Sequence, residues 1–339
     1  MRALRFHGPG KLRLEDVAAP QPSSDRVVIA VTACGVCGSD LHFLDGTART
    51  GKVPITLGHE IAGVVDDPGS SGLRRGTAVA VTVGASCGSC RRCAEERPNL
   101  CERVAVIGIH VDGGLADAVS VPATSALVIP AGVDPAAAAT AVDAGATAFH
   151  AVARTAAVQP GETVLVIGLG GLGTYAAQIA RNQGAGRVIA ADVDPAALDR
   201  APSLGVNECV LVEPGGSLGR SVKLLTDGGV DVALEFVGRA ATVDAAVKSI
   251  RPGGRAVVVG VGPEPLVTLP PVLWSNFEYT LRGSYGSLPG DTERVLAGLA
   301  DGSLQAPPLA RVTLADAAAA MLSLSRGESR SAGRLVVVP

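Results

Sequence analysis

Four cysteines within fifteen residues form the densest group of metal-ligand side chains in the sequence. They are Cys87, Cys90, Cys93 and Cys101. Four thiolates in one short segment are typical of a closed, tetrahedral structural zinc site, where metal binding orders the loop. An iron–sulfur cluster is the alternative, but a ferredoxin-type run has three residues before its last cysteine, whereas seven stand here. We therefore expect structural zinc in a lobe at about residues 86–102.

A glycine-rich turn could bind the phosphates of a dinucleotide. Its residues are Gly168, Leu169, Gly170, Gly171, Leu172 and Gly173. The turn follows an apolar segment, 163–167, that predicts a strand, and it precedes a predicted helix at 171–183, as this motif requires. Gly168 permits the tight turn, Gly170 lets the backbone approach a pyrophosphate, and Gly173 lets helix and strand pack closely. The helix N-terminus then favours the anion.

Asp192 ends the next predicted strand, 187–192, about twenty residues after the glycine-rich turn. A carboxylate there accepts hydrogen bonds from the adenosine ribose and repels a 2′-phosphate. Because Val193 and Asp194 follow instead of an arginine, the sequence favours NAD over NADP. In the alternative interpretation, Asp192 only caps the helix that Pro195 opens, which is compatible with either cofactor.

Cysteine and histidine also occur in two shorter segments nearer the N-terminus. The first contains Cys34, Cys37, Ser39 and His42, and the second contains His59 and Glu60. A Cys-x-x-Cys pair could be a redox centre, but that motif belongs in a small βαβ domain, and this part of the chain is β-rich. Ligands from separate loops instead fit catalytic zinc, which has three protein ligands and one open position.

The segments that must position these residues indicate two kinds of architecture. Runs of β-branched residues at 27–32, 62–65 and 77–83 predict a β-rich first third. From about residue 144, helical stretches alternate with predicted strands at 163–167, 187–192, 210–212, 230–235 and 256–259. This alternation predicts a doubly wound parallel sheet. Helices at 291–300 and 314–324 and a strand at 334–338 complete the expected elements.

Length and composition fit two domains. The chain has 339 residues, 47% hydrophobic and 18% charged, so it can bury a large core. Its net charge of −3 offers no basic surface for nucleic acid or an anionic membrane. We find no signal-peptide pattern, and the long uncharged stretch at 163–180 is better explained as strand, turn and helix than as a membrane span. The seven cysteines favour metal binding in a reducing cytoplasm over disulfides.

Over nearly its whole length the sequence resembles the zinc-dependent medium-chain alcohol dehydrogenases. The resemblance rests on four motifs in the family's order: the segments 37–42 and 58–60, the four-cysteine lobe and the glycine-rich turn. It implies an α/β protein with a GroES-like β-rich catalytic domain and a Rossmann domain containing a doubly wound parallel sheet. We expect the catalytic domain at 1–145, the Rossmann NAD-binding domain at 146–282, and a segment at 283–339 that returns to the catalytic domain.

The resemblance also implies roles for individual residues. Cys37, His59 and Asp143 would bind the catalytic zinc, with Asp143 just before the helix that leads into the Rossmann domain. Glu60 would lie behind this zinc or, as in some members of the family, bind it directly or transiently. Arg334 would reach the phosphates of the cofactor.

The implied activity is reversible hydride transfer between NAD and a secondary, aromatic or polyol-like alcohol, with zinc as the Lewis acid. Ser39 would accept the alcohol proton and His42 would relay it to solvent. The alternative is a zinc-free, quinone-reductase-like or non-catalytic member of the same superfamily, which would not need these cysteine and histidine sets. The resemblance further implies two zinc ions per chain and a homotetramer, or else a dimer. Cys34 and Cys209 have no implied role, and we expect both to be buried.

Overall fold

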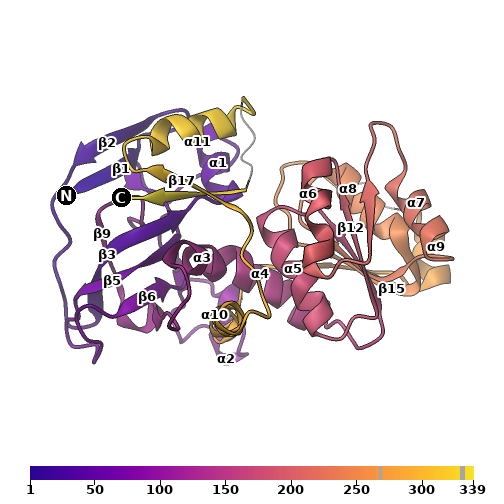
Figure 1. The fold of residues 1–339 in the computed structure, drawn as a ribbon, viewed down its shortest axis with the longest axis horizontal. Helices are drawn as coiled ribbons and strands as arrows, with labels where there is room; N and C mark the ends of the chain where they lie inside the picture. The colour runs from indigo at the N-terminus through magenta and orange to yellow at the C-terminus, as the bar shows by residue number, and fades with distance from the viewer. Residues whose placement is uncertain (267–268, 329–332) are drawn as a thin grey trace. The chain divides into compact units, whose positions relative to one another are not determined.

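The chain forms two compact units, as the computed structural model of residues 1–266, 269–328 and 333–339 shows (Figure 1). Unit 1 comprises Met1–Ala144, Leu288–Asp301 and Ala306–Pro339. Unit 2 comprises Gly145–Ser287 and Gly302–Gln305. The cysteine and histidine motifs therefore lie in unit 1, and the glycine-rich turn lies in unit 2.

Unit 1 is built on a seven-stranded sheet and a three-stranded sheet. The larger sheet has the order β10-β6-β5-β3-β18-β17, with β9 also paired to β3, and the smaller has the order β2-β1-β4. The strands are β1 (Arg2–Phe6), β2 (Leu12–Asp16), β3 (Arg26–Gly35), β4 (Ile55–Thr56), β5 (Glu60–Asp67), β6 (Ala78–Val81), β9 (Ala118–Pro122), β10 (Ala126–Val128), β17 (Leu309–Thr313) and β18 (Arg334–Val338). This is the β-rich part that the sequence predicts.

Strand β3 is the centre of unit 1 because its apolar residues face covered surfaces on both sides. Seven of its ten residues are buried, and the strand pairs with β5 along most of its length. Near its end, β3 also pairs with β18, with Gly35 opposite Val336 and Cys34 opposite Val337. The last strand of the chain therefore lies in the same sheet as β3.

Unit 1 also contains short helices. They are α1 (Gly38–Asp45), α2 (Arg91–Ala94), α3 (Pro135–Thr140), α10 (Asp291–Asp301) and α11 (Ala317–Ser325). Helix α11 packs against α1 and β2, and Figure 1 shows it lying over the β1–β2 pair. The four-cysteine lobe lies between β7 (Gly84–Ala85) and β8 (Ala105–Val106), which pair with each other.

Unit 2 contains six parallel strands in the order β13-β12-β11-β14-β15-β16. They are β11 (Thr163–Ile167), β12 (Arg187–Asp192), β13 (Glu208–Leu211), β14 (Val230–Glu235), β15 (Ile250–Val258) and β16 (Thr280–Gly283). In chain order this is 3-2-1-4-5-6, the order of a dinucleotide-binding sheet. The predicted doubly wound parallel sheet is confirmed.

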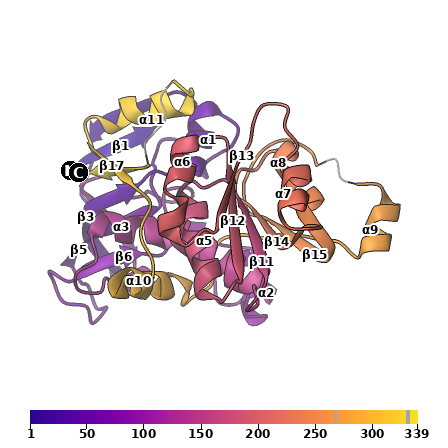
Figure 2. The ribbon, with the colours of Figure 1, turned by 45° about the vertical axis from the view of Figure 1, so that its right-hand side comes forward.

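Helices lie on both faces of this sheet. They are α4 (Ala146–Phe149), α5 (Gly171–Asn182), α6 (Pro195–Asp199), α7 (Leu218–Leu225), α8 (Ala240–Ser249) and α9 (Pro271–Phe277). Figure 2 shows α5 and α6 on one face and α7 and α8 on the other. The uncharged stretch at 163–180 forms β11, the turn and α5, and within the described residues no helix is long and apolar enough to cross a membrane.

Two expectations need correction. The helix predicted at 314–324 begins at Ala317, because the Thr313 hydroxyl donates to Asp316 and closes a turn before it. Cys34 is buried as expected, but Cys209 is exposed. The prediction for Cys209 was wrong because β13 is an edge strand, whose outer residues have fewer neighbours.

Candidate active site

Cys37 lies between strand β3 and helix α1, at the N-terminal end of the helix. Its backbone N–H donates a hydrogen bond to Asp40 Oδ2 at 2.9 Å. This bond holds Cys37 against the first turn of the helix. In the β3–β5 pair, Gly35 lies opposite Glu60, so the loop after β3 and the start of β5 are at the same end of the sheet. Strand pairing therefore brings Cys37 close to His59.

Four potential metal ligands converge at this point. They are Cys37, His59, Glu60 and Asp143, and their candidate ligand atoms all lie within 4.8 Å of one another. Cys37 Sγ is 3.2 Å from Asp143 Oδ2, and His59 Nε2 is 3.5 Å from the same oxygen. A tetrahedral zinc with bonds of about 2.0–2.3 Å places neighbouring ligand atoms about 3.3–3.8 Å apart. The donor set and its spacing therefore fit catalytic zinc.

Asp143 reaches the cluster from a π-helical turn, Ala141–Gly145. This turn follows α3, which begins with the Asp134 side chain accepting a hydrogen bond from the Ala136 N–H. A π-helical turn inserts extra backbone into a helix and is frequent at functional sites. Here it turns a carboxylate towards a thiol that lies more than a hundred residues earlier in the chain.

The buried charges shift pKa values in opposite directions. Burial raises the pKa of Cys37, and the charge of Asp143 raises it further. Burial opposes the charge on Asp143, but hydrogen bonding and the charge of His59 outweigh it and hold the pKa of Asp143 far below its usual range. Burial lowers the pKa of His59, yet Asp40 and Asp143 outweigh this and raise it well above its usual value. A divalent cation bound here would displace protons from Cys37 and His59.

Asp40 is a site residue that the sequence analysis did not identify. Its side chain is fully buried, and its Oδ1 is 3.7 Å from His59 Nδ1. Neither of these two atoms has a hydrogen-bond partner within the part of the chain that the structure describes. A carboxylate behind a metal-binding histidine orients the ring and fixes its tautomer. The sequence signal for Asp40 was an acidic residue three positions after Cys37, where its side chain can complete the capping box of α1.

Glu60 and Arg334 form a buried ion pair behind the ligands. Glu60 is 0% exposed and Arg334 is 11% exposed, and a Cβ at Gly35 would lie 2.0 Å from Glu60 Oε2. Only glycine fits at that point of β3. Burial raises the pKa of Glu60 to about 7, against the opposing charge of Arg334. The contact of Arg334 with cofactor phosphates stays a prediction.

Ser39 and His42 lie in the first and second turns of α1. Ser39 Oγ is 3.8 Å from Cys37 Sγ, so its hydroxyl lies at the edge of the ligand cluster. His42 is half-buried, and its Nδ1 is 3.0 Å from Thr47 Oγ1. The structure thus brings Ser39 to the cluster and places His42 one turn further along the helix.

The four cysteines of the lobe also form one cluster. Their sulfur atoms lie within 4.8 Å of one another. The Sγ–Sγ distances are 4.0 Å for Cys87–Cys93, 3.5 Å for Cys90–Cys93 and 3.9 Å for Cys90–Cys101. Four Zn–S bonds of 2.3 Å require sulfur separations of about 3.8 Å, whereas a disulfide would need about 2 Å. The lobe therefore fits a structural zinc site.

Hydrogen-bond donors close to the lobe contact its thiols. The Ser89 backbone N–H, with help from Arg103, lowers the pKa of Cys87 to about 5. Arg103 Nη2 donates to Cys87 Sγ at 3.5 Å, and its backbone N–H donates to Cys101 Sγ at 3.4 Å. Desolvation and the neighbouring thiols raise the pKa of Cys93 to about 11, so zinc binding there must release a proton.

The glycine-rich turn has the geometry that a dinucleotide requires. Gly168 has a φ of +87°, in the left-handed region that favours glycine. A Cβ on Gly173 would lie 1.9 Å from Gly168 O, so α5 can pack here only without a side chain. Around Gly170, in contrast, a Cβ would have no neighbour within 4 Å, which leaves space for a pyrophosphate. Gly171 and Leu172 open the helix itself.

Asp192 joins the end of β12 to this turn. Its Oδ2 accepts a hydrogen bond from the Leu169 N–H at 2.7 Å, and its Oδ1 accepts one from the Asp194 N–H at 2.9 Å. Helix α6 is capped by Asp194, which accepts from the Ala196 N–H. The alternative in which Asp192 caps this helix is therefore wrong, because Asp194 occupies the position before Pro195.

Glu235 is a second residue that the sequence analysis missed. It is fully buried at the carboxyl end of β14, which pairs with β11. Its Oε1 accepts hydrogen bonds from the Val237 N–H, the Gly238 N–H and the Thr242 hydroxyl, each at 2.8 Å. The Val237 side chain lies against Gly168. Glu235 thus holds the loop that packs on the glycine-rich turn. The sequence signal for this residue was an acid at the end of a buried strand.

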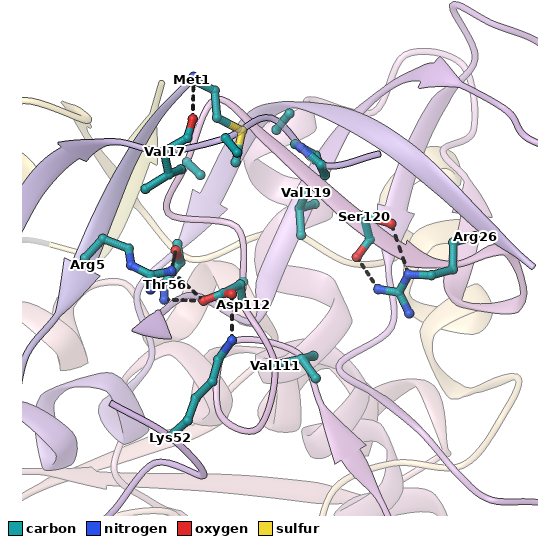
Figure 3. Close-up of a pocket in the computed structure, with 15 residues that line it drawn as sticks. Met1, Arg5, Val17, Arg26, Lys52, Thr56, Val111, Asp112, Val119 and Ser120 are labelled. Carbon is teal, nitrogen blue, oxygen red and sulfur yellow. Dashed lines mark hydrogen bonds and ion pairs between the residues drawn. The ribbon is translucent and has the colours of Figure 1, made fainter. Parts of the chain in front are cut away.

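A pocket of about 460 Å³ in unit 1 shares no residue with these sites (Figure 3). Within it, Asp112 accepts hydrogen bonds from Arg5 and Lys52, and Arg26 donates to Ser120. Its charged groups are bonded to one another or to neighbouring polar atoms. The pocket is therefore not the candidate active site.

Comparison with known proteins identifies the family. Residues 23–131 match the alcohol dehydrogenase GroES-like domain, and residues 171–301 match the zinc-binding dehydrogenase domain. The chain is 32% identical to sorbitol dehydrogenase of Bacillus subtilis (strain 168) over 311 residues, which cover 89% of this chain and 87% of that protein.

Solved structures agree with this assignment. The alcohol dehydrogenase of Aeropyrum pernix superposes with a TM-score of 0.90 at 30% identity, with 100% of both chains covered. A zinc-binding dehydrogenase of Sinorhizobium meliloti 1021, bound to NADP, superposes with a TM-score of 0.90 at 31% identity, covering 100% of this chain and 99% of that one. The expected combination of a GroES-like domain and a Rossmann sheet is confirmed. The chain belongs to the zinc-dependent medium-chain alcohol dehydrogenases, a family of oxidoreductases.

Proposed function

We propose that this protein reversibly oxidises an alcohol with NAD, using zinc held by Cys37, His59 and Asp143. The observation that carries the proposal is the convergence of a thiol, an imidazole and a carboxylate on one point of unit 1. Bound zinc would act as a Lewis acid on the alcohol oxygen, and NAD would accept the hydride. A zinc-free or non-catalytic member of the superfamily would have no use for this buried ligand set.

The second zinc ion of the proposal belongs to the lobe. Its ligands are Cys87, Cys90, Cys93 and Cys101. Four thiolates would leave no position open for a substrate, so zinc held by them would stabilise the loop and take no part in the reaction. Two zinc ions per chain follow from the two clusters.

Proton transfer is assigned to Ser39 and His42. Ser39 Oγ, at the edge of the cluster, accepts the proton of the substrate hydroxyl, and His42 passes it on to solvent. Glu60 supplies a further carboxylate behind the ligands. Arg334 is proposed to contact the cofactor phosphates, because its guanidinium is positively charged and its Nε forms no hydrogen bond within the described residues.

NAD is preferred to NADP in this proposal because of Asp192. We propose that Gly168, Gly170, Gly171, Leu172 and Gly173 form the pyrophosphate-binding turn. The Asp192 carboxylate, held beside it by the Leu169 N–H, would accept the ribose hydroxyls and repel a 2′-phosphate. The next residue is the exposed Val193, which offers no partner for such a phosphate.

The proposed substrate is a secondary, aromatic or polyol-like alcohol. Sorbitol dehydrogenase, a polyol-acting relative by name, supports the polyol class. We assign catalysis to residues 1–145 with 283–339 and cofactor binding to residues 146–282. The reduced thiols of both clusters favour the cytoplasm as the place of action.

We also propose that the protein is a homotetramer, with a dimer as the alternative. Strand β16 is an edge strand of the parallel sheet. Large apolar side chains are exposed nearby in sequence: Val261, Leu266, Val272, Phe277 and Tyr285. Exposed apolar groups beside an unpaired strand edge are typical of surfaces that associate.

The test combines zinc analysis with NADH formation across a panel of alcohols. We expect two zinc ions per chain and activity with NAD. Ser39→Ala should keep both zinc ions and NADH binding but slow the hydride step by about 10²–10⁴, the usual effect of a positioned acid–base group. Cys90→Ser should lose one zinc ion and melt at a lower temperature. Wild-type oxidation rates in zinc-loaded Ser39→Ala would refute the assigned proton acceptor, and a fully active protein without zinc would refute the function.

A further inference from the structure

His42, Asp45 and Thr47 form a hydrogen-bonded network at the C-terminal end of α1. Gly46, with a φ of 85°, ends the helix, and Thr47 follows it. Asp45 Oδ1 accepts the Thr47 backbone N–H at 2.8 Å and lies 2.6 Å from Thr47 Oγ1. The same hydroxyl oxygen is 3.0 Å from His42 Nδ1. One threonine hydroxyl therefore lies between a carboxylate and an imidazole.

The number of protons in this network determines the histidine tautomer. A threonine hydroxyl has one proton to donate. At 2.6 Å from the Asp45 carboxylate, Thr47 Oγ1 must donate that proton to it, since two oxygens with no proton between them repel each other at this distance. Thr47 Oγ1 can then only accept a hydrogen bond from His42. The neutral ring thus carries its proton on Nδ1 and its lone pair on Nε2.

We propose that Asp45 and Thr47 are positioning residues that hold His42 in the Nδ1–H tautomer, with Nε2 as the proton acceptor of the relay. Within the described residues, Nε2 has no hydrogen-bond partner of its own. The relay step rests on the proposed function, whereas the tautomer assignment does not. Uptake of a proton forms the Nε2–H bond and gives an imidazolium, and loss of this Nε2 proton to water restores the neutral Nδ1–H ring.

Asp45 also faces the charge that forms in this step. Its Oδ2 is 3.6 Å from His42 Nδ1, and no other ion pair to His42 occurs in the described part of the chain. Helix α11, which packs against α1, has no charged residue from Ala317 to Ser325. The His42 and Asp45 side chains are 32% and 35% exposed, so solvent weakens the interaction and moderate effects are expected.

The first test is ¹⁵N NMR of the zinc-loaded protein labelled at its five histidines, with His42→Gln to assign the signal. We expect the Nδ1–H tautomer in the wild type and in Thr47→Ser, which keeps the hydroxyl. Thr47→Val and Asp45→Asn should shift the ring towards Nε2–H. Thr50→Val is the matched control, because within the described residues its hydroxyl donates only to the Lys52 carbonyl in the same loop. A wild-type ring in the Nε2–H form overturns the proposal.

The second test is the pH profile of alcohol oxidation. Thr47→Val and Asp45→Asn should slow the oxidation about three- to tenfold near neutral pH, with a defect that shrinks as pH rises and water replaces the relay. In a His42→Gln background, the same substitutions should have no further effect. Unchanged rates in variants whose tautomer has shifted would overturn the relay role. If the wild type has the Nδ1–H ring but shows no NAD-linked oxidation, the proposed function and the relay role are both overturned. The tautomer assignment alone is then supported.

Discussion

The metal-ligand cluster of unit 1 and the glycine-rich turn of unit 2 are held by different kinds of contact. The cluster gathers ionisable side chains, and several of its buried atoms, such as Glu60 Oε2 and His59 Nδ1, have no hydrogen-bond partner in the described residues. The turn consists of backbone whose shape its glycines permit. The carboxylate beside it, that of Asp192, accepts a hydrogen bond from the Leu169 N–H. The cluster therefore depends on a cation to balance its charges, whereas the turn is held by glycine packing and hydrogen bonds within the protein.

This difference predicts unequal sensitivity to substitution. Loss of one ligand from the cluster leaves buried charges that no cation balances, which is strongly unfavourable. Loss of one contact near the turn leaves most of its backbone geometry in place. Substitutions in the cluster should therefore abolish activity, and substitutions near the turn should change affinity or stability by smaller amounts.

The largest effect is expected from Cys37→Ala. Without the thiolate, the buried zinc should be lost and alcohol oxidation should fall below detection, because the substrate hydroxyl loses its Lewis acid. Elemental analysis should find one zinc ion left, in the lobe. Cys34→Ala is the matched control: Cys34 is also buried but belongs to neither cluster, so this variant should keep two zinc ions and activity. Alcohol oxidation by Cys37→Ala protein that lacks the buried zinc would contradict the greater sensitivity expected of the cluster.

A smaller loss is expected from Asp40→Asn, which keeps the shape of the side chain but removes its charge. His59 then lacks the carboxylate that orients it, and the affinity of the buried site for zinc should fall about 10–100-fold. Competition with a chelator, monitored by activity and by bound zinc, gives this ratio. The lobe should retain its zinc at the wild-type affinity. If the wild type and Asp40→Asn retain zinc equally at the buried site, Asp40 does not contribute to zinc binding there.

In unit 2, Asp192→Ala combined with Val193→Arg should move preference from NAD towards NADP by about tenfold or more. The change removes a charge that repels the 2′-phosphate and adds one that binds it. The ratio of kcat/KM for the two cofactors measures the shift. Asp194→Ala removes the cap of α6 and should leave the ratio unchanged. A wild-type preference for NADP would disprove the role of Asp192.

The smallest effect concerns the acid stability of unit 2. Arg255 forms two hydrogen bonds with Glu162, at 2.8 and 2.6 Å, and these outweigh burial and lower the pKa of Glu162. The pair stabilises the fold above the pKa of an unfolded glutamate, about 4.3, and this contribution is lost as pH falls through the lower folded value. Glu162→Gln should lower Tm by about 2–4 °C at pH 7 and by less at pH 3.

Glu208→Gln provides the control for this experiment. Glu208 pairs with Arg187 but is 35% exposed, against 18% for Glu162, so its loss should change Tm less. Thermal unfolding at pH 7, 5 and 3 compares the two variants with the wild type. A Tm difference for Glu162→Gln that is as large at pH 3 as at pH 7 would show that packing, rather than charge, causes it.

The same contrast explains what the sequence could predict. The four-cysteine lobe and the glycine-rich turn are continuous segments, so spacing alone indicates their chemistry. Asp40 and Glu235 act by contacting His59 and the loop over Gly168, and those contacts depend on strand register and loop packing. The ion pair between Arg334 and Glu60 depends on the return of β18 to β3. The exposure of Cys209 depends on the order of strands in the sheet.

The pairing of β18 with β3 has a consequence for synthesis on the ribosome. Arg334 follows Glu60 by 274 residues, which takes roughly 14–55 s at 5–20 residues per second. Throughout this time the Glu60 carboxylate lacks its counter-charge and the Cys34–Gly35 edge of β3 is unpaired, and before it ends all of unit 2 has been synthesised. We therefore expect unit 2 to fold cotranslationally before unit 1 is complete. In ribosome-bound chains arrested at residue 333, directly before β18, residues 1–144 should be cleaved by protease faster than residues 145–287, and equal protection of both would refute this order of folding.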